Sequence, residues 1–271
     1  MTAVHAGMDQ FGVLVFHDQP INDDQQLVFS RSLGPLEQAT GDIAAPQDRR
    51  MSMDLNDISN LDKHNKVLAR DDRRRLFGLG NQLWHSDSSF KPVPAKYSLL
   101  SARTIPPTGG NTEFADMRAA YDALPEEVKQ RLRGLVAEHA IMYSRKKLGF
   151  TDFSDEENQT LPPVPQVLVR RHAGSGRKGL YLASHAGRIF GMSAEEGDAL
   201  LQQLIEHATQ RQFVYAHRWR VHDLVMWDNR CTMHRGKGYD DLRWPRDMQR
   251  ATVSDVAPTC EQEGIEVPAA A

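Results

Sequence analysis

Short apolar runs bounded by turn residues recur along most of the chain, a pattern typical of β-strands. The run Val13–Phe16 has the pattern of a strand buried on both of its faces. Five further runs predict strands at residues 97–105, 166–171, 179–183, 223–229 and 251–256. In addition, the turn at 107–111 leads into a strand that would begin near Thr112.

Apolar residues three and four positions apart predict three helices. Asn22 and Gln25 have the spacing of a capping box for the first, Pro125 begins the second, and Ser193 and Glu196 form a capping box for the third. The expected apolar faces are Leu27, Val28 and Leu33; Val128, Leu132, Leu135 and Val136; and Leu200, Leu201, Leu204, Ile205 and Ala208.

The order of these elements excludes two common architectures. There is no regular alternation of strands and helices and no glycine-rich phosphate loop, so neither a Rossmann fold nor a P-loop fold is expected. We predict one domain over residues 1–271, mainly β with α insertions, built as a β-sandwich or jelly roll. The polar stretch 38–83 is the expected active-site lid, and residues 257–271 are expected to form a flexible tail.

Composition narrows the class of protein. The 271 residues carry 33 basic and 36 acidic side chains, so no global charge attracts nucleic acid or an anionic membrane. No stretch approaches the roughly 18 apolar residues of a membrane span, and the N-terminus lacks the features of a signal peptide. The two cysteines, Cys231 as a small core residue and Cys260 in a polar tail, favour a reducing cytoplasm. The sequence leaves open whether the chain forms a homo-oligomer.

A candidate metal site is formed by His85, Asp87 and His234. In an extended segment His85 and Asp87 point to the same face, but chance alone supplies roughly one His-x-Asp pattern at this composition. Two histidines and one carboxylate are the ligand set of non-haem Fe(II) oxygenases. A zinc site that includes Cys231 lacks a second cysteine.

Two arginines downstream are candidates for binding acids. Arg246 and Arg250 are four residues apart, which places both side chains on one face of a strand or of a helix. Guanidinium groups bind carboxylates through paired hydrogen bonds, so two inward arginines could bind two different acids. A pair of surface arginines is the alternative.

In combination, these motifs resemble the TauD/TfdA family of Fe(II)- and 2-oxoglutarate-dependent dioxygenases, whose fold is a double-stranded β-helix (jelly roll) with flanking helices. The resemblance covers residues 10 to 255 and is strongest to the 2,4-dichlorophenoxyacetate dioxygenase branch. The runs that carry it are NQLWHSDSSF at 81–90, PTGGNTEF at 107–114, ADMRAAYDAL at 115–124 and HATQ at 207–210.

The resemblance implies a role for each matching residue. His85, Asp87 and His234 would bind Fe(II), and Arg250 would bind the anionic head of the substrate. Thr112, Trp227 and Arg246 would form the 2-oxoglutarate site. Asn81 and Ser88 would help to hold the substrate. His172 and His185 match histidines near the site, although buried structural roles remain open for both.

The reaction that the resemblance implies consumes 2-oxoglutarate and O2, with ascorbate as a supporting reductant, and hydroxylates a small anionic organic substrate. For a phenoxyalkanoate such as 2,4-dichlorophenoxyacetate, the ether would break to give a phenol and glyoxylate, besides succinate and CO2. A sulfonate or sulfate-ester dioxygenase is the alternative within the family. A zinc hydrolase and a non-catalytic metal-binding jelly roll are the alternatives from other classes.

The sequence departs from the family pattern in two places. Members usually begin with an extra strand and loop before the first helix, whereas this chain begins almost at that helix, so we expect an edge strand to be missing. The spacing from His234 to Arg246 is one residue longer than usual. We attribute this difference to an insertion around Asp240 and Asp241 that leaves the register of the arginines unchanged.

Overall fold

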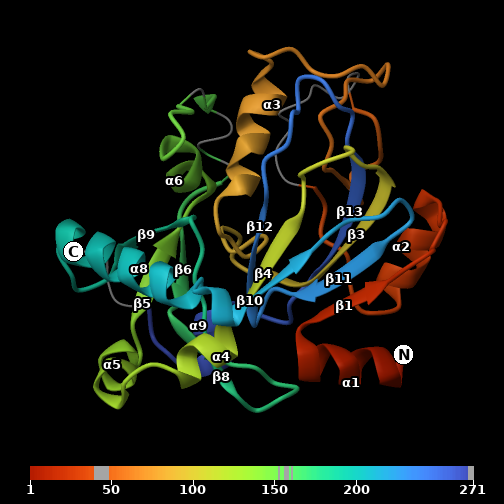
Figure 1. The fold of residues 1–271 in the computed structure, drawn as a ribbon. Coiled ribbons are helices and arrows are strands. Elements are labelled where there is room, and N and C mark those ends of the chain that lie inside the picture. Colours follow the sequence, from red (N-terminus) through yellow and green to blue (C-terminus); the bar gives the residue numbers. More distant parts are fainter. Residues whose placement is uncertain (40–48, 152, 156–158, 160, 268–271) are drawn as a thin grey trace.

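The computed structural model describes residues 1–39, 49–151, 153–155, 159 and 161–267. Its largest layer is a five-stranded antiparallel sheet (Figure 1). In spatial order the strands are β1 (Val13–Phe16), β11 (Leu224–Asp228), β3 (Ala95–Thr104), β13 (Asp247–Ser254) and β2 (Asn56–Asp57). Among the described strands, β1 pairs with β11 alone, and it is half-buried, so the prediction that it is buried on both faces is wrong. An edge strand leaves part of its surface open to water.

A three-stranded antiparallel sheet packs against the inner face of this layer. It contains β10 (Val214–His217), β4 (Thr112–Asp116) and β12 (Thr232–Gly236), with β4 in the centre. Phe114 on β4 contacts Trp227 on β11, with their ring centroids 5.5 Å apart. Leu100 and Val225 join the same apolar cluster between the sheets. Because side chains alternate along a strand, the neighbouring Leu224 of β11 faces the opposite side.

Helices α1 (Thr2–Phe11) and α2 (Asp23–Arg31) cover that opposite side of the large sheet (Figure 1). The predicted capping box of α2 is confirmed, since Asn22 and Gln25 exchange hydrogen bonds. Leu27 is buried as predicted. Val28 is 69% exposed, so its assignment to the apolar face is wrong. Residues 27 and 28 are about 100° apart around a helix, and only the first faces the sheet.

A second group of elements lies beside the two sheets. Its strands are β6 (Val164–Val167), β5 (Val136–His139) and β9 (Ala186–Ile189), and a separate pair, β7 (Val169–Arg171) and β8 (Lys178–Leu180). Helices α4 (Met117–Asp122), α5 (Glu126–Leu132) and α8 (Ala194–Ala208) accompany them. The predicted strand at 166–171 is therefore split between β6 and β7.

The structure confirms one of the two predicted helices in this group and shortens the other. Ser193 and Glu196 form the capping box of α8, whose leucines are buried. The helix that begins after Pro125 ends at Leu132, so the predicted extension to Val136 is wrong. Val136 instead begins β5, because Gly134 has a positive φ of 72° that breaks the helix.

The C-terminal segment is partly ordered. Helix α9 (Thr259–Glu263) packs on β6 and buries Cys260 against Val136 and Val167. The prediction of a flexible tail is wrong for residues 259–263, and Cys260 is a core residue. Residues 268–271 of that prediction lie outside the described residues.

The predicted lid contains more regular structure than its polar sequence suggested. Besides β2 it holds α3 (Arg73–Gly78) and the 3-10 helix η2 (Leu79–Gln82), which leads directly to His85. Residues 40–48 of the predicted lid lie outside the described residues, and its movement stays a prediction. The short helices α6 (Ile141–Lys146) and η3 (Arg211–Phe213) complete the fold. No helix in the described part of the chain is long and apolar enough to cross a membrane.

Candidate active site

Two reciprocal backbone hydrogen bonds bring His85 and His234 together. The amide of His85 donates to the carbonyl of His234 at 3.0 Å, and the amide of His234 donates back at 2.8 Å. This is the hydrogen-bonded pair of an antiparallel ladder, in which opposite side chains share one face. The ring centroids consequently lie 4.2 Å apart.

Asp87 lies between the two imidazoles. Its carboxylate oxygens are 3.8 Å from Nε2 of His85 and 3.7 Å from Nε2 of His234. Ser98 on β3 donates to Oδ2 at 2.7 Å, and the side chain of Asn229 in turn donates to Ser98 at 2.9 Å. The carboxylate is therefore held in place from behind, with both histidines in front.

The hydrogen bonds fix which ring nitrogen of His85 is free. Its Nδ1 lies 2.7 Å from the carbonyl oxygen of Leu83, which can only accept, so Nδ1 carries the proton. Burial lowers the pKa of both His85 and His234, which keeps the rings neutral. The Nε2 atom of His85 thus has a lone pair available for a metal ion.

These three residues lie on the wall of a cavity of about 360 Å³. The cavity extends between the two facing sheets and the segment 49–82 that precedes His85. Its lining also contains the other residues predicted for the site: Asn81, Ser88, Thr112, His185, Trp227, Arg246 and Arg250. The structure therefore brings these predicted residues together at one cavity, and the role of each stays a prediction.

The predicted 2-oxoglutarate residues come from β4, from β11 and from the position just before β13. Thr112 is buried at the start of β4, and its hydroxyl accepts a hydrogen bond of 2.9 Å from Trp219. The ring of Trp227 lies 4.7 Å from that of His234. The guanidinium group of Arg246 donates one long hydrogen bond, 3.4 Å to the carbonyl of Ile58, and burial lowers its pKa to about 10.

Arg250 contacts the metal-site carboxylate directly. Its Nη1 lies 2.5 Å from Oδ1 of Asp87. Burial would raise the pKa of Asp87, but Arg250 and the other neighbours outweigh this effect and lower it to about 2. The carboxylate is therefore ionised at neutral pH, as a metal ligand must be. Both Arg246 and Arg250 line the cavity despite the longer loop before them, which confirms that they share a face.

Ser88 and His185 differ in how freely they face the cavity. The Ser88 hydroxyl donates to Oε1 of Glu37 at 2.5 Å, and the residue has a positive φ of 54°. His185 stacks edge-on to His85 with the centroids 5.8 Å apart, and its Nδ1 is 3.0 Å from Ser144. The Ser88 hydroxyl is therefore engaged by Glu37, whereas the ring of His185 lies next to the candidate metal ligand His85.

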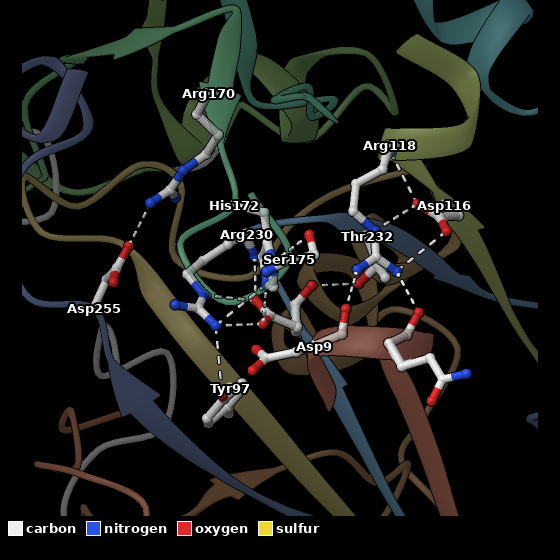
Figure 2. Close-up of polar contacts among 12 residues, drawn as sticks. Asp9, Tyr97, Asp116, Arg118, Arg170, His172, Ser175, Arg230, Thr232 and Asp255 are labelled. Atoms are coloured by element: carbon white, nitrogen blue, oxygen red, sulfur yellow. Dashed lines mark hydrogen bonds and ion pairs between the residues drawn. The ribbon is translucent and has the colours of Figure 1, made fainter. Parts of the chain in front are cut away.

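His172 lies elsewhere, in a second buried cluster with Asp228 and Cys231. Figure 2 shows it beside Ser175 and Arg230, and it does not belong to the cavity lining. Its Nε2 lies 2.9 Å from Oδ2 of Asp228, and Nδ1 lies 2.9 Å from Ser175. Both ring nitrogens are thus occupied by protein groups. Of the two readings left open for His172, the structure supports the structural one.

Arg145 lines the cavity and was missed by the sequence analysis. It lies on α6, a six-residue helix too short to give a periodic pattern. Phe77 and Phe90, which also line the cavity, carry no signal that separates them from ordinary core residues. The nearest usable signal is the run 81–90, which includes Phe90.

Comparison with known proteins gives consistent results. Residues 1–252 match the family described as taurine catabolism dioxygenase TauD, TfdA family. The chain is 52% identical over 250 residues to the alpha-ketoglutarate-dependent 2,4-dichlorophenoxyacetate dioxygenase of Cupriavidus pinatubonensis, covering 92% of this chain and 87% of the relative. It is 41% identical to an (S)-phenoxypropionate/alpha-ketoglutarate-dioxygenase of Sphingobium herbicidovorans, over 85% of this chain and 78% of that protein.

A solved structure agrees with these sequence matches. The crystal structure of AAD-2 in complex with Mn(II) and N-oxalylglycine superposes with a TM-score of 0.87 at 57% sequence identity. The match covers 95% of this chain and 88% of the other.

Proposed function

Because the chain belongs to the taurine catabolism dioxygenase TauD, TfdA family, we propose that it is an Fe(II)- and 2-oxoglutarate-dependent dioxygenase for an aryloxyalkanoate such as 2,4-dichlorophenoxyacetate. The observation that carries this proposal is the set of three donors, His85, Asp87 and His234, on the wall of a cavity that also holds Arg246 and Arg250. A zinc hydrolase or a metal-binding module would need no second cation for a dicarboxylate cosubstrate.

The donor set fits a ferrous ion. The ligand atoms of the three residues lie within 4.8 Å of one another, and two imidazoles with one carboxylate leave positions open on an octahedral ion. The neutral Nε2 of His85 and the ionised Asp87 are in the protonation states that metal binding requires. Ser98 would hold the carboxylate in its orientation.

The cavity has a cation for the far carboxylate of 2-oxoglutarate. Arg246 is half-buried, and no carboxylate of the described residues lies within ion-pairing distance of it. Thr112 supplies a hydroxyl and Trp227 an indole face on the same wall. A charged group in a water-poor site binds its counter-ion strongly, so this end of the cavity would fix the cosubstrate.

The remaining wall suits an aromatic acid. Arg250 would contact the anionic head of the substrate. Asn81 and Ser88 line the same cavity and would help to hold the substrate, Ser88 through its backbone or through its contact with Glu37. The cavity lining includes the apolar side chains of Phe77, Leu79, Phe90, Leu100 and Ile141. Such side chains bury an aryl ring without hydrogen-bond requirements.

The proposed reaction joins two oxidations. When bound, ferrous iron with 2-oxoglutarate and O2 supplies the oxidising power, which the side chains of the cavity lack. One atom of O2 enters succinate as CO2 leaves, and the other enters the C–H bond beside the ether oxygen. The resulting hemiacetal collapses to a phenol and glyoxylate. The protein's own residues position the carbon and exclude water.

We further propose that the two facing sheets form the double-stranded β-helix of the family. The bridge between His85 and His234 joins the segment that enters the large sheet to β12 of the small one, which would close the two faces around the site. Both cysteines are free and buried, in keeping with a proposed cytoplasmic location.

Dioxygen uptake tests the proposal. The protein is supplied with Fe(II), ascorbate and 2-oxoglutarate, and uptake is measured across phenoxyacetates, phenoxypropionates, alkyl sulfates and taurine. We expect uptake, succinate and a phenol with the aryloxy acids. The relatives named for sulfate or sulfonate substrates are less similar to the chain than those named for aryloxy acids. Release of sulfite or sulfate without any phenol would overturn the substrate assignment but not the family.

A further inference from the structure

We propose that Arg145, together with Arg250, binds the anionic head of the organic substrate. This inference rests on the proposed function and adds a residue to it. Arg145 lies on α6 and lines the same cavity as His85 and Arg250. It is a specificity-determining residue in this proposal, because it would distinguish acids from neutral molecules of the same shape.

Arg145 is a buried cation without a counter-ion. Its side chain belongs to a residue that is 5% exposed, and the described residues place no carboxylate within ion-pairing distance of it. Nη1 donates to Ser144 at 2.9 Å, whereas Nε has no hydrogen-bond partner. Burial, and then the nearby charge of Arg250, lower its pKa to about 10, so it remains charged at neutral pH.

Buried arginines elsewhere in the protein have carboxylate partners. Arg230 is paired with Asp228 at 2.6 Å, and Arg170 with Asp255 at 2.7 Å. Figure 2 shows Arg170 and Asp255 joined in this way. An uncompensated buried charge is costly, and proteins normally pair it. Arg145 departs from that pattern at the cavity wall, where a ligand can supply the missing anion.

The guanidinium group of Arg145 is held in a fixed position. It lies over the ring of Phe77, with Cζ 4.2 Å from the centroid. It also lies directly against Gly80 in η2, where an added Cβ would overlap the guanidinium group. A cation fixed by stacking loses little freedom when it binds a carboxylate, which favours tight binding.

The charges in the cavity match two anionic ligands. Arg246 and Arg145 both lack a carboxylate partner among the described residues, while Arg250 is already paired with Asp87. 2-Oxoglutarate brings a far carboxylate to Arg246 in the proposed function. The second anion, the head of the substrate, would then lie between Arg145 and Arg250, whose positive charges otherwise repel each other. Phe90 and Ile141 beside them would contact the aryl ring.

The test compares an acid with its neutral analogue. Binding of 2,4-dichlorophenoxyacetate and of 2,4-dichlorophenoxyethanol is measured by calorimetry on protein loaded with Mn(II) and N-oxalylglycine. Arg145→Met should weaken binding of the acid by about 30-fold or more, the loss expected for one partner of a buried charge pair. Binding of the alcohol should change by about fivefold or less. Arg145→Lys keeps the charge and should restore part of the acid affinity.

A matched glycine pair separates position from charge. Gly80→Ala should displace the guanidinium group while keeping its charge, and lower acid affinity by about tenfold, the equivalent of one charge-assisted hydrogen bond. Gly238→Ala, at a residue outside the cavity lining, has open space for its Cβ and should leave affinity unchanged. This pair also covers the case in which Arg145→Met fails to fold.

Each outcome has a distinct meaning. Equal losses for acid and alcohol in Arg145→Met, or equal effects of the two alanine variants, would overturn the role of Arg145. If the unaltered protein releases no phenol from any aryloxy acid, the proposed function fails. In that case the role of Arg145 is decided by the same calorimetry with a sulfate ester that the unaltered protein turns over, by comparing its affinity for the unaltered protein and for Arg145→Met.

Discussion

Among the described residues, two buried clusters of candidate metal ligands combine histidine with aspartate, and they differ in what their polar atoms contact. One is His85, Asp87 and His234 at the cavity, and the other includes His172 and Asp228 at the end of β11. In each, the candidate ligand atoms lie within 4.8 Å of one another. Distance between donors therefore does not distinguish a metal site from a structural network.

In the second cluster the protein itself uses the donor atoms. Arg230 donates to both oxygens of Asp228, at 2.9 and 2.6 Å, and His172 lies 2.9 Å from Oδ2. Burial would raise the pKa of Asp228, but Arg230 and His172 lower it well below its usual range. Burial raises the pKa of Cys231, so its thiol stays protonated and is a poor metal ligand.

In the first cluster both oxygens of Asp87 accept hydrogen bonds, from Arg250 and Ser98, but the histidine nitrogens that face the carboxylate remain available. Nε2 of His85 has a free lone pair, and its neighbours are a cavity and a second imidazole rather than a donor from the protein. The difference shows that a metal site is identified by unused lone pairs at a cavity wall. A pattern of residue types in the sequence does not report that property.

Replacing one histidine in each cluster by alanine should give the largest difference in activity and iron binding between the two clusters. His234→Ala should abolish turnover and the weak visible absorbance of the anaerobic Fe(II)–2-oxoglutarate complex, because two ligands hold the ion poorly. His172→Ala should keep both, with a lower melting temperature. Iron content after gel filtration provides the measurement. Full activity in His234→Ala would contradict the assignment of the metal site.

The second cluster should respond in stability instead. Asp228→Asn leaves the buried charge of Arg230 uncompensated, and should lower the free energy of unfolding by about 3–5 kcal/mol in urea titrations. Because the pKa of Asp228 is lowered in the folded protein, this difference should shrink as the pH falls below about 4.

A surface pair is the control for that variant. Asp122 and Arg177 form an exposed ion pair, so Asp122→Asn should cost about 1 kcal/mol or less. Iron binding should be unchanged in both variants. A loss of iron in Asp228→Asn at a temperature where it is folded would show that the two clusters are coupled.

The comparison also shows what sequence could predict. Capping boxes and apolar stripes located α2 and α8 because these signals are local. The strands β5, β9, β10 and β12 were not predicted. They are four or five residues long with partly polar sequences, and they form through pairing with distant segments.

The same distinction holds for the site. The ligands and the arginine pair were found because their spacing matches a family motif. The sequence could not distinguish the roles of His172 and His185, because these depend on whether each side chain faces the cavity in the folded protein. Arg145 was missed because its significance lies in an absent partner, a property of the tertiary structure.

Arg246 offers a sharper test within the cavity. Arg246→Ala should raise the concentration of 2-oxoglutarate needed for half-maximal rate by about 30-fold or more, since a buried carboxylate loses its partner. Aryloxy acid binding should change little. If Arg246→Ala reaches half-maximal rate at the same concentration of 2-oxoglutarate as the unaltered protein, Arg246 does not belong to the cosubstrate site. Arg211→Ala on η3, outside the cavity lining, is the control.

The smallest expected effect is that of Arg250→Gln. Arg250 contacts Asp87 of the metal site and, in the proposed function, the substrate. If Arg145 shares the anionic head, the KM for 2,4-dichlorophenoxyacetate should rise by about tenfold, the value of one charged hydrogen bond. Arg250 also neutralises Asp87, but a bound metal ion supplies positive charge to the same carboxylate. Iron content and the KM for 2-oxoglutarate should therefore stay nearly unchanged. An equal rise in both KM values, with loss of iron, would show that Arg250 acts through Asp87 and not on the substrate.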